Sequence, residues 1–376
     1  MKQNENKALC PRMWQGLSDR DGESAYPCCR FDYFDEAGVR FKNFATIEAA
    51  YNSPFFQQKR EQMLSGETPH ECRRCSTEES VGIKSERSYA LDSDPKFNPL
   101  SQKASLSSVT YLELFTGNTC NLRCHSCNPT SSSSWASEYR NLGWSWPREE
   151  QTTVLCENIE AFTSLTELKI IGGEPTLSPL FHNTIQKVKS KENIEIYIST
   201  NCTQFLSTDL IEQLKKFKKV WISLSIDGPQ GVNDLIRYPS KWEQVELVAK
   251  KYIDLAQHQS NFRINLHTTV YLLNLTKLSA LLNWWEFLTK DMKGCKYHLS
   301  LLQSPDFMSL QNITPEGVEN ILPKIKEDPR LKSIADFIES QAPYHGTTLP
   351  QLFSYCQQLD AQRKVDTSSL IKYLLR

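Results

Sequence analysis

The chain has 376 residues, of which 39% are hydrophobic, so it is long enough to bury a large core and to form more than one domain. Its net charge of −1 and pI near 6.7 exclude an overall attraction to nucleic acid or to anionic membranes. No stretch approaches 18 consecutive apolar residues, and the first residues, MKQNENKALC, lack an apolar signal region. A cytoplasmic protein without a membrane span is therefore expected.

Residues 1–106 hold many turn residues and end in the polar segment LDSDPKFNPLSQKASLSS, so they are predicted to form a separate cysteine-rich module joined by a linker. Residues 107–311 alternate β-rich and helical runs. Residues 312–376 are expected to be helical, since their apolar residues recur at helical spacing.

Six strands are predicted in the middle region, at residues 109–115, 165–171, 194–200, 219–226, 262–270 and 296–302. They are rich in β-branched and aromatic residues, and several are almost continuously apolar, as strands buried on both faces are. Helical patterns lie between them, for example at 242–256 and 275–290. Six strand–helix repeats predict an α/β fold with a parallel sheet, open or curled into part of a barrel, that binds ligands at the carboxyl ends of its strands.

The twelve cysteines need an explanation, because clustered cysteines in a reducing compartment are more often metal ligands or catalytic groups than disulfides. Two groups are clustered: Cys10, Cys28, Cys29, Cys72 and Cys75 in the first region, and Cys120, Cys124 and Cys127 after the first predicted strand. Four are isolated and are each expected to be small buried side chains: Cys156, Cys202, Cys295 and Cys356.

The cluster at Cys120, Cys124 and Cys127 has one ligand fewer than usual. Structural zinc sites and iron–sulfur clusters normally have four protein ligands. Three cysteines on one loop leave a coordination position for a distant protein ligand or for a small molecule. The first alternative predicts a structural metal, and the second predicts a reactive site.

The Cys-x3-Cys-x2-Cys pattern after the first strand of a β/α repeat resembles the signature of radical S-adenosylmethionine (radical SAM) enzymes. In that superfamily the three thiolates hold a [4Fe–4S] cluster, and S-adenosylmethionine binds the fourth iron. The resemblance implies that reduction of the cluster cleaves S-adenosylmethionine to a 5′-deoxyadenosyl radical, which abstracts a hydrogen atom from a substrate. It also implies a partial (β/α)6 TIM-type barrel.

Three later segments at successive strand ends resemble motifs of the same superfamily: GGEP at 172–175, STNC at 199–202 and SIDG at 225–228 with a following arginine. The resemblance implies that S-adenosylmethionine is bound by Gly172, Gly173, Glu174, Ser199, Asn201, Ser225, Asp227 and Arg237. Glu174 is expected to bind the methionyl ammonium. Arg237 is expected to pair with the carboxylate, which its planar guanidinium suits.

Two positions depart from the superfamily pattern. Ser126 replaces the aromatic residue usually found near the adenine, so adenine contacts are expected from the backbone or from later strands around Val270 or Leu272. Cys202 replaces the glycine of the STNG-type segment and is expected to be packed in the core. His125, beside Ser126, is expected to face solvent.

In the first region, Cys10, Gly22 and the following YPC resemble the opening half of a SPASM or twitch domain, which carries an auxiliary cluster. The resemblance implies a second [4Fe–4S] cluster held by Cys10, Cys28, Cys72 and Cys75. Cys28 is preferred to Cys29 because neighbouring residues on an extended chain point in opposite directions. A zinc ribbon is the alternative. The late segment QQLDAQRKVD also resembles a group of twitch-domain radical SAM proteins.

SPASM and twitch relatives act most often on ribosomally made peptides, so the resemblance implies an enzyme that modifies a peptide or protein side chain. Two alternatives remain, a radical SAM oxidoreductase acting on a sugar or nucleoside-like small molecule and a metal-binding partner protein without catalysis. An electron donor such as flavodoxin or ferredoxin is implied as a partner. No catalytic acid or base is assigned, although His267, His298 and Asp306 are candidates.

Overall fold

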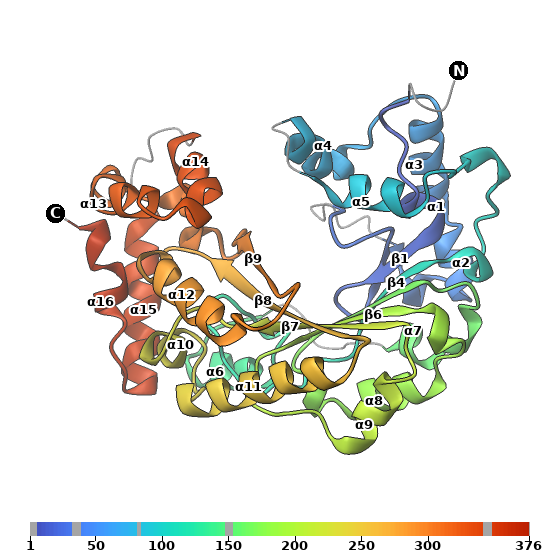
Figure 1. Cartoon of the computed structure of the whole chain (residues 1–376). Helices are drawn as coiled ribbons and strands as arrows, with labels where there is room; N and C mark the ends of the chain where they lie inside the picture. The colour runs from blue at the N-terminus through green and yellow to red at the C-terminus, as the bar shows by residue number, and fades with distance from the viewer. Residues whose placement is uncertain (1–5, 32–38, 81–83, 147–152, 341–347, 376) are drawn as a thin grey trace. The chain divides into compact units, whose positions relative to one another are not determined.

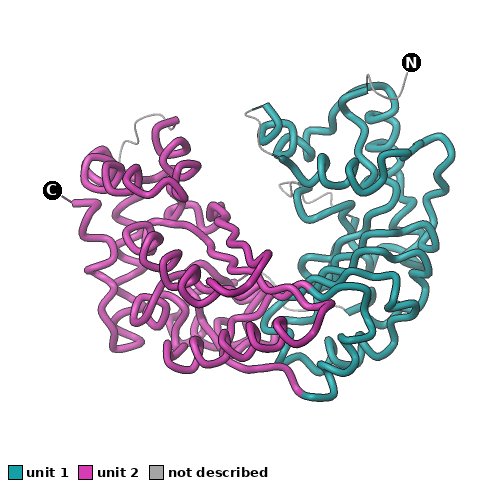
Figure 2. The backbone as a smooth tube through the Cα atoms, in the orientation of Figure 1, with its two compact units in different colours: residues 1–118, 148–198, 208–220 teal, residues 119–147, 199–207, 221–376 magenta. Residues whose placement is uncertain are grey.

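The computed structural model of the chain contains two compact units, shown in different colours in Figure 2. Unit 1 comprises residues 1–118, 148–198 and 208–220, and unit 2 comprises residues 119–147, 199–207 and 221–376. The structure describes residues 6–31, 39–80, 84–146, 153–340 and 348–375. These units group the chain differently from the three predicted regions, whose boundaries stay a prediction.

Unit 1 is built on a sheet with the strand order β3-β2-β1-β4-β5-β6 (Figure 1). An N-terminal hairpin of β1 (Gly16–Asp19) and β2 (Ser24–Tyr26) is extended by β3 (Val39–Arg40), and β2 pairs in antiparallel fashion with both β1 and β3. β1 also pairs in parallel with β4 (Tyr111–Phe115), which is followed in parallel by β5 (Glu167–Ile171) and β6 (Glu195–Thr200). The hairpin is thus part of the same sheet as the first β/α repeats.

The two faces of this sheet differ in chemistry, because alternate strand residues point to opposite sides. One face is fully buried and apolar, with Leu112, Leu114, Leu168, Ile170, Ile196 and Ile198. The other is polar, with Tyr111, Glu113, Glu167, Lys169 and Tyr197. The helices of unit 1 are α1 (Arg12–Gln15), α2 (Ile47–Tyr51), α3 (Pro54–Leu64), α4 (Arg73–Ser80), α5 (Glu86–Ser93), α7 (Val154–Glu157), α8 (Pro179–Lys187) and α9 (Thr208–Leu214).

Unit 2 contains most of β7 (Lys219–Ser225), then β8 (Phe262–Val270) and β9 (Lys296–Leu301), of which β8 and β9 pair in parallel. Its helices are α6 (Ser133–Asn141), α10 (Gly231–Ile236), α11 (Trp242–His258) and α12 (Leu278–Thr289). The C-terminal part adds α13 (Pro315–Lys326), α14 (Lys332–Ser340), α15 (Leu349–Arg363) and α16 (Ser368–Ile371). The predicted helices at 242–256 and 275–290 correspond to α11 and α12.

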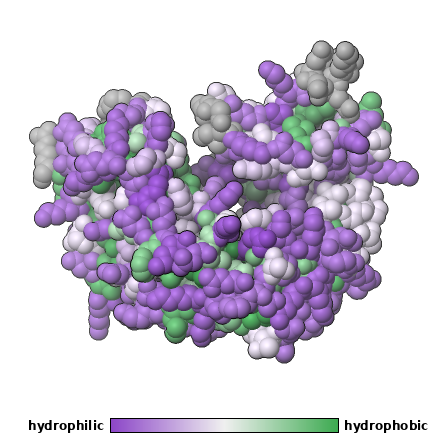
Figure 3. Space-filling view, viewed as in Figure 1, coloured by the Kyte–Doolittle hydropathy of each residue, from purple (hydrophilic) through white to green (hydrophobic). Residues whose placement is uncertain are grey.

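All six predicted strands are present as β4 to β9, with ends within two residues of the expected positions, and helices follow them. The parallel α/β fold and the helical C-terminal region are therefore confirmed. Within the described residues, no helix is long and apolar enough to cross a membrane. On the face shown in Figure 3 hydrophilic residues predominate, and large exposed apolar side chains such as Leu64, Leu100 and Phe287 belong to separate elements.

Candidate functional site

The loop that follows β4 carries Cys120, Cys124 and Cys127. Cys124 is buried and the other two are half-buried. Burial raises the pKa of Cys124 to about 11. The positive charge of Arg237 opposes this rise, and the negative charge of Cys120 adds to it. Burial and the charges of Cys124 and Cys120 also raise the pKa of Cys127. The three sulfurs are therefore close enough to influence one another, and metal binding there must displace protons.

Backbone hydrogen bonds hold this loop to the end of α10. The N–H of Arg123 donates to the carbonyl of Tyr238 at 2.6 Å, and the N–H of His125 donates to the carbonyl of Ile236 at 2.9 Å. These two bonds lie on either side of Cys124 in the sequence. They therefore tie the position of this cysteine to the position of the segment that ends α10.

Three side chains fix the carbonyls of the same loop. Arg123 O accepts from Arg363 Nη2 (2.8 Å), Cys124 O from Trp135 Nε1 (2.7 Å) and His125 O from the Tyr355 hydroxyl (2.9 Å). Two of the donors, Arg363 and Tyr355, belong to α15. With the bonds to α10, both polar groups of the backbone are satisfied at Arg123 and His125, which holds the loop in one conformation.

His125 is fully buried, so the expectation that it faces solvent is wrong. Its Nδ1 lies 3.3 Å from the carbonyl of Ile236 and 3.4 Å from Nη1 of Arg363. Burial and the positive charge of Arg363 lower the pKa of His125 to about 3, so the ring is neutral at pH 7. The expectation failed because α15, more than two hundred residues later, covers this side of the loop.

Asp227 and Arg237, from the SIDG segment, form a buried ion pair with Oδ2 and Nη1 2.7 Å apart. Asp227 Oδ1 also accepts from the N–H of Thr269 at 2.9 Å. Burial alone would lower the pKa of Arg237, but the negative charges of Cys124 and Asp227 raise it. The segment therefore lies beside the cysteine loop, with one end of the Arg237 guanidinium held by Asp227. Its pairing with a ligand carboxylate stays a prediction.

The STNC segment also contacts the cysteine loop. Asn201 Nδ2 donates to Asn121 Oδ1 at 3.0 Å and lies 4.0 Å from Cys120 Sγ. Asn121 in turn donates to the Thr203 hydroxyl at 2.9 Å. Ser199 is exposed at the end of β6. Asn201 thus has a direct contact with the loop, whereas a ligand role for Ser199 stays a prediction.

Cys202 is fully buried with a φ of 59°, in the left-handed region that favours glycine. This conformation accounts for the glycine in the related motif, and the expectation of a packed side chain is confirmed. Cys156 and Cys356 are buried as expected, but Cys295 is half-buried, in the short connection between α12 and β9.

In unit 1, the GGEP turn packs against the turn after β4. Gly172 has a φ of 132°, and a Cβ there would overlap the carbonyl oxygen of Gly117. The N–H of Gly173 donates to the same carbonyl at 2.9 Å. Glu174 is buried, and its Oε1 accepts from the hydroxyl of Thr176 at 2.8 Å. Glycine is thus needed by the backbone at position 172, while the roles of Gly173 and Glu174 in binding the co-substrate stay a prediction.

The other candidates lie within or after β7 to β9. Ser225 is half-buried as the last residue of β7. His267 and His298 are register neighbours on β8 and β9, with ring centroids 5.4 Å apart, and Asp306 lies in the 3-10 turn after β9. No acid–base role follows from these positions.

Sequence reasoning missed Tyr271, which follows β8 between the two residues it named for adenine. Val270, Tyr271 and Leu272 are all fully buried. Burial raises the pKa of Tyr271, and the side chain of Ser126 lies close enough to lower it in part. The Tyr271 hydroxyl therefore lies near Ser126, and it comes from a strand end and not from the loop. The aromatic residue at that strand end was the available signal.

The five N-terminal cysteines differ in their surroundings, and their roles as ligands stay a prediction. Those that line one small pocket of about 20 Å³ in unit 1 are Cys10, Cys28, Cys72 and Cys75. Cys29 does not line it. Burial raises the pKa of Cys29, and the nearby Lys169 opposes this, so Cys29 lies toward the polar face of the sheet.

The donor sets consist of thiols, which both iron–sulfur clusters and zinc take as ligands. Among the described residues, no group of three or more His, Cys, Asp or Glu side chains is arranged to hold one metal ion. The ligands of a multi-iron cluster bind different iron atoms, so their sulfurs need not converge on one point. Thiolates are the ligands that such clusters take. The three-cysteine loop therefore has the donor chemistry of a cluster site, and an auxiliary cluster at the four-cysteine pocket stays a prediction.

The fold and this site define an α/β protein with a three-thiol cofactor loop at the end of a parallel strand. Residues 114–279 match the family described as the Radical SAM superfamily. This segment, which includes the three-cysteine loop and the GGEP, STNC and SIDG segments, is therefore similar to the radical SAM domain. No curated protein sequence matches the chain.

Solved structures of radical SAM proteins show only distant similarity to the chain. One described as native anSMEcpe with bound AdoMet is 18% identical, with a TM-score of 0.39, and the alignment covers 62% of each chain. SuiB of Streptococcus suis bound to S-adenosylmethionine is 15% identical, with a TM-score of 0.35 and coverage of 60% of this chain and 44% of that one. TYW1 with a lysine-pyruvate adduct is 15% identical, with a TM-score of 0.34 and coverage of 59% and 70%. The chain thus spans less than two thirds of the first of these.

Proposed function

We propose that this protein uses a [4Fe–4S] cluster and S-adenosylmethionine to modify a peptide or protein side chain. The observation that carries the proposal is the loop of Cys120, Cys124 and Cys127, held rigidly within a radical SAM domain. When bound, the cluster supplies the electron that cleaves S-adenosylmethionine to a 5′-deoxyadenosyl radical, which abstracts a hydrogen atom from the substrate.

The chain's own residues position the cofactor and the co-substrate. The bonds from α10 and α15 preorganise the loop before any ligand binds, so little ordering cost remains. Asn201 and the Asp227–Arg237 pair stand beside the cysteines with polar groups of both signs, as a zwitterionic amino-acid group requires. We propose that the co-substrate is bound by these residues together with Gly172, Gly173, Glu174, Ser199 and Ser225.

The second part of the proposal is an auxiliary cluster in an N-terminal twitch-like module. Its support is the convergence of four cysteines, separated by up to 65 positions in sequence, on one pocket. A thiol-lined pocket of this kind, in a protein that already handles iron–sulfur chemistry, favours a [4Fe–4S] cluster over zinc. A peptide substrate is proposed by analogy with proteins of the SPASM and twitch type, and a small-molecule substrate and a non-catalytic role are the alternatives. The cytoplasmic location stays a prediction.

Anaerobic reconstitution tests the first part. Reconstituted protein reduced with dithionite should convert S-adenosylmethionine to 5′-deoxyadenosine, and Cys124→Ala should abolish the conversion. Cys156→Ala is a matched control, since Cys156 is also buried but lies in unit 1 on α7. A wild-type protein that binds iron at the loop but never forms 5′-deoxyadenosine would favour the non-catalytic alternative.

Neighbouring cysteines give a matched test of the auxiliary site. Cys28→Ser should lose the iron of one cluster while the radical SAM cluster remains, and Cys29→Ser should keep both. Metal analysis and Mössbauer spectra measure this directly. If the protein holds stoichiometric zinc that iron reconstitution does not displace, the site is a zinc ribbon and not an auxiliary cluster. Equal losses of iron in both variants would contradict the assignment of Cys28 as the ligand.

Cell extract distinguishes the two substrate classes. Formation of 5′-deoxyadenosine should be stimulated by the macromolecular or peptide fraction, and protease treatment of that fraction should remove the stimulation. Stimulation that survives protease and passes through an ultrafiltration membrane would favour a sugar or nucleoside-like substrate.

A further inference from the structure

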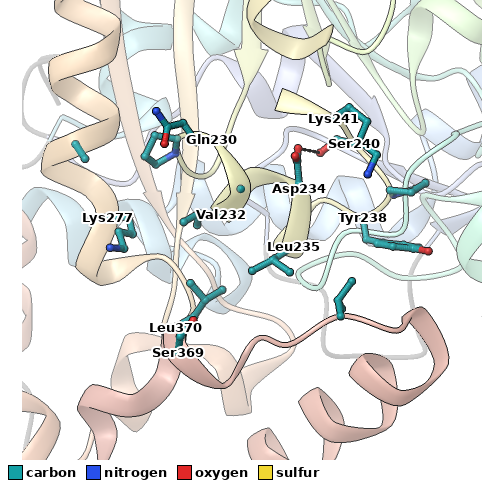
Figure 4. A pocket seen from close by; sticks show the side chains of 15 residues that line it. Gln230, Val232, Asp234, Leu235, Tyr238, Ser240, Lys241, Lys277, Ser369 and Leu370 are labelled. Atoms are coloured by element: carbon teal, nitrogen blue, oxygen red, sulfur yellow. Dashed lines mark hydrogen bonds between the residues drawn. The ribbon is translucent and has the colours of Figure 1, made fainter. Parts of the chain in front are cut away.

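Unit 2 has a cavity of about 760 Å³ beside α10, within the size range of ligand-binding sites. Four parts of the chain line it: residues 229–235 of the α10 region, residues 238–241, Lys277 with Ala280, and the C-terminal Val365, Ser369 and Leu370. Figure 4 shows Val232, Leu235 and Leu370 around the same space, with Tyr238 at one side. None of these residues belongs to the proposed co-substrate site.

One wall of the cavity is bonded directly to the cysteine loop. Tyr238 lines the cavity, and its carbonyl accepts the hydrogen bond from Arg123, the residue before Cys124. The carbonyl of Ile236 accepts from His125, the residue after it. The backbone that forms this wall is therefore one hydrogen bond away from both neighbours of Cys124.

Side chains continue the same connection. The Tyr238 ring has the guanidinium of Arg123 at 4.9 Å and that of Arg363 at 5.1 Å from its centroid. Arg363 also lies 4.9 Å from the ring of Trp135, whose Nε1 donates to Cys124. Packed atoms thus run without a break from the cavity to the cysteine loop. Electron tunnelling slows steeply with distance, so a surface that contacts the cysteine loop directly is suited to electron entry.

The rim of the cavity is cationic. Lys241 and Lys277 are exposed lining residues, whereas Asp234 is the single carboxylate among them. Asp234 accepts a hydrogen bond from the Ser240 hydroxyl at 3.4 Å, drawn in Figure 4. Burial raises the pKa of Asp234, the nearby Lys241 lowers it, and Glu243 raises it further. Two exposed ammonium groups beside apolar side chains suit a partner that presents carboxylates around an apolar contact.

We propose that this cavity is the docking site of an acidic one-electron carrier protein, with a flavin or an iron–sulfur centre, that reduces the cluster at Cys120, Cys124 and Cys127. The inference rests on the proposed function. In the step, the carrier loses one electron and the cluster gains it, and no proton or group moves. Electron-transfer complexes have small interfaces, and their association is guided by charges at the rim.

Charge reversal tests the docking site with reduced flavodoxin as the probe and dithionite as a carrier-free reductant. Lys241→Glu/Lys277→Glu should slow reduction of the cluster by flavodoxin at least about tenfold at low ionic strength and leave reduction by dithionite unchanged. The matched control is Lys326→Glu/Lys332→Glu, which changes the same charge on α13 and α14. Titration calorimetry with cluster-free protein should show the same loss of flavodoxin affinity.

Ser369→Trp gives a test that does not depend on charge, since Ser369 is exposed on the cavity wall and a large ring there would block contact. This variant should slow reduction of the cluster by flavodoxin and leave reduction by dithionite unchanged. Unchanged flavodoxin rates and affinities in both the charge-reversal and Ser369→Trp variants would overturn the docking site. A wild-type protein that dithionite cannot reduce would instead mean that the proposed function itself has failed.

Discussion

Arg363 of α15 binds Glu138 of α6 through two hydrogen bonds, Nε to Oε1 at 3.1 Å and Nη2 to Oε2 at 2.6 Å. Both side chains are only 1% exposed. The same guanidinium reaches the carbonyl of Arg123 in the cysteine loop. Arg363 lies in the segment QQLDAQRKVD, so this segment helps to hold the cysteine loop in place.

Arg363→Leu should destabilise the cluster-free protein by about 3 kcal/mol, because the buried Glu138 carboxylate then keeps only its longer, 3.7 Å contact with Arg123. Urea unfolding measures the change. Glu138→Leu/Arg363→Leu should recover a large part of it, since no buried charge is then left unpaired. Arg330→Leu is a control on a more exposed ion pair and should cost about 1 kcal/mol. A loss below about 1 kcal/mol for Arg363→Leu would show that the buried pair does not stabilise this region.

Cys202 occupies a backbone position that suits glycine. Cys202→Gly should change the free energy of unfolding by less than about 1 kcal/mol, because relief of the left-handed strain offsets the lost buried thiol and the added chain entropy. Cys202→Val should cost more than about 2 kcal/mol, since a β-branched residue at positive φ is strongly disfavoured. Chemical unfolding of both variants compares them. Equal stabilities would show that the backbone at 202 adapts freely.

Gly172 is required for two reasons, positive φ and the closeness of Gly117. Gly172→Ala should cost about 2–3 kcal/mol and weaken binding of S-adenosylmethionine, because the turn before Glu174 must move. Gly143→Ala is the matched control, with a φ of 70° and open space around it, and should cost only about 1 kcal/mol of strain. Thermal unfolding and equilibrium binding separate the effects. Similar losses at both glycines would remove the steric argument.

The strands could be predicted from sequence because the local composition of each run already favours the strand that the structure contains. Leu112, Leu114 and Ile198, for instance, lie in runs whose composition already favours a buried strand, and these runs became β4 and β6. The parallel pairing of β1 with β4 could not be predicted in the same way. It joins residues about 95 positions apart and depends on where the N-terminal hairpin packs, which no local pattern records.

The cysteines and the motif positions of the site were also readable, because spacing alone brings three thiols onto one loop. The supports of that loop were not. His125 is buried by Arg363 and Tyr355, and the hydroxyl near Ser126 comes from Tyr271. These contacts arise only when distant helices and strand ends pack together, so the residues that hold the cysteine loop were missed, although the three cysteines themselves were named.

The ion pair of Asp328 and Arg330 makes the free energy of unfolding depend on pH in the acidic range. Hydrogen bonds from Arg330, at 2.8 Å from Nε and 2.6 Å from Nη2, hold the pKa of Asp328 at about 2, below its ordinary 3.8. Because the folded-state pKa is the lower one, the carboxylate stabilises the fold fully above about pH 4 and loses this effect as pH falls toward 2.

Asp328→Asn should therefore lower the free energy of unfolding by about 1 kcal/mol at pH 7, a value reduced by the partial exposure of Arg330. The gap between wild type and variant should narrow as pH falls from 4 to 3, which urea unfolding at each pH measures. Asp336→Asn, on the exposed pair with Lys332, should show almost no gap at any pH. A constant difference for Asp328→Asn across this range would mean that its effect comes from packing and not from the ionised carboxylate.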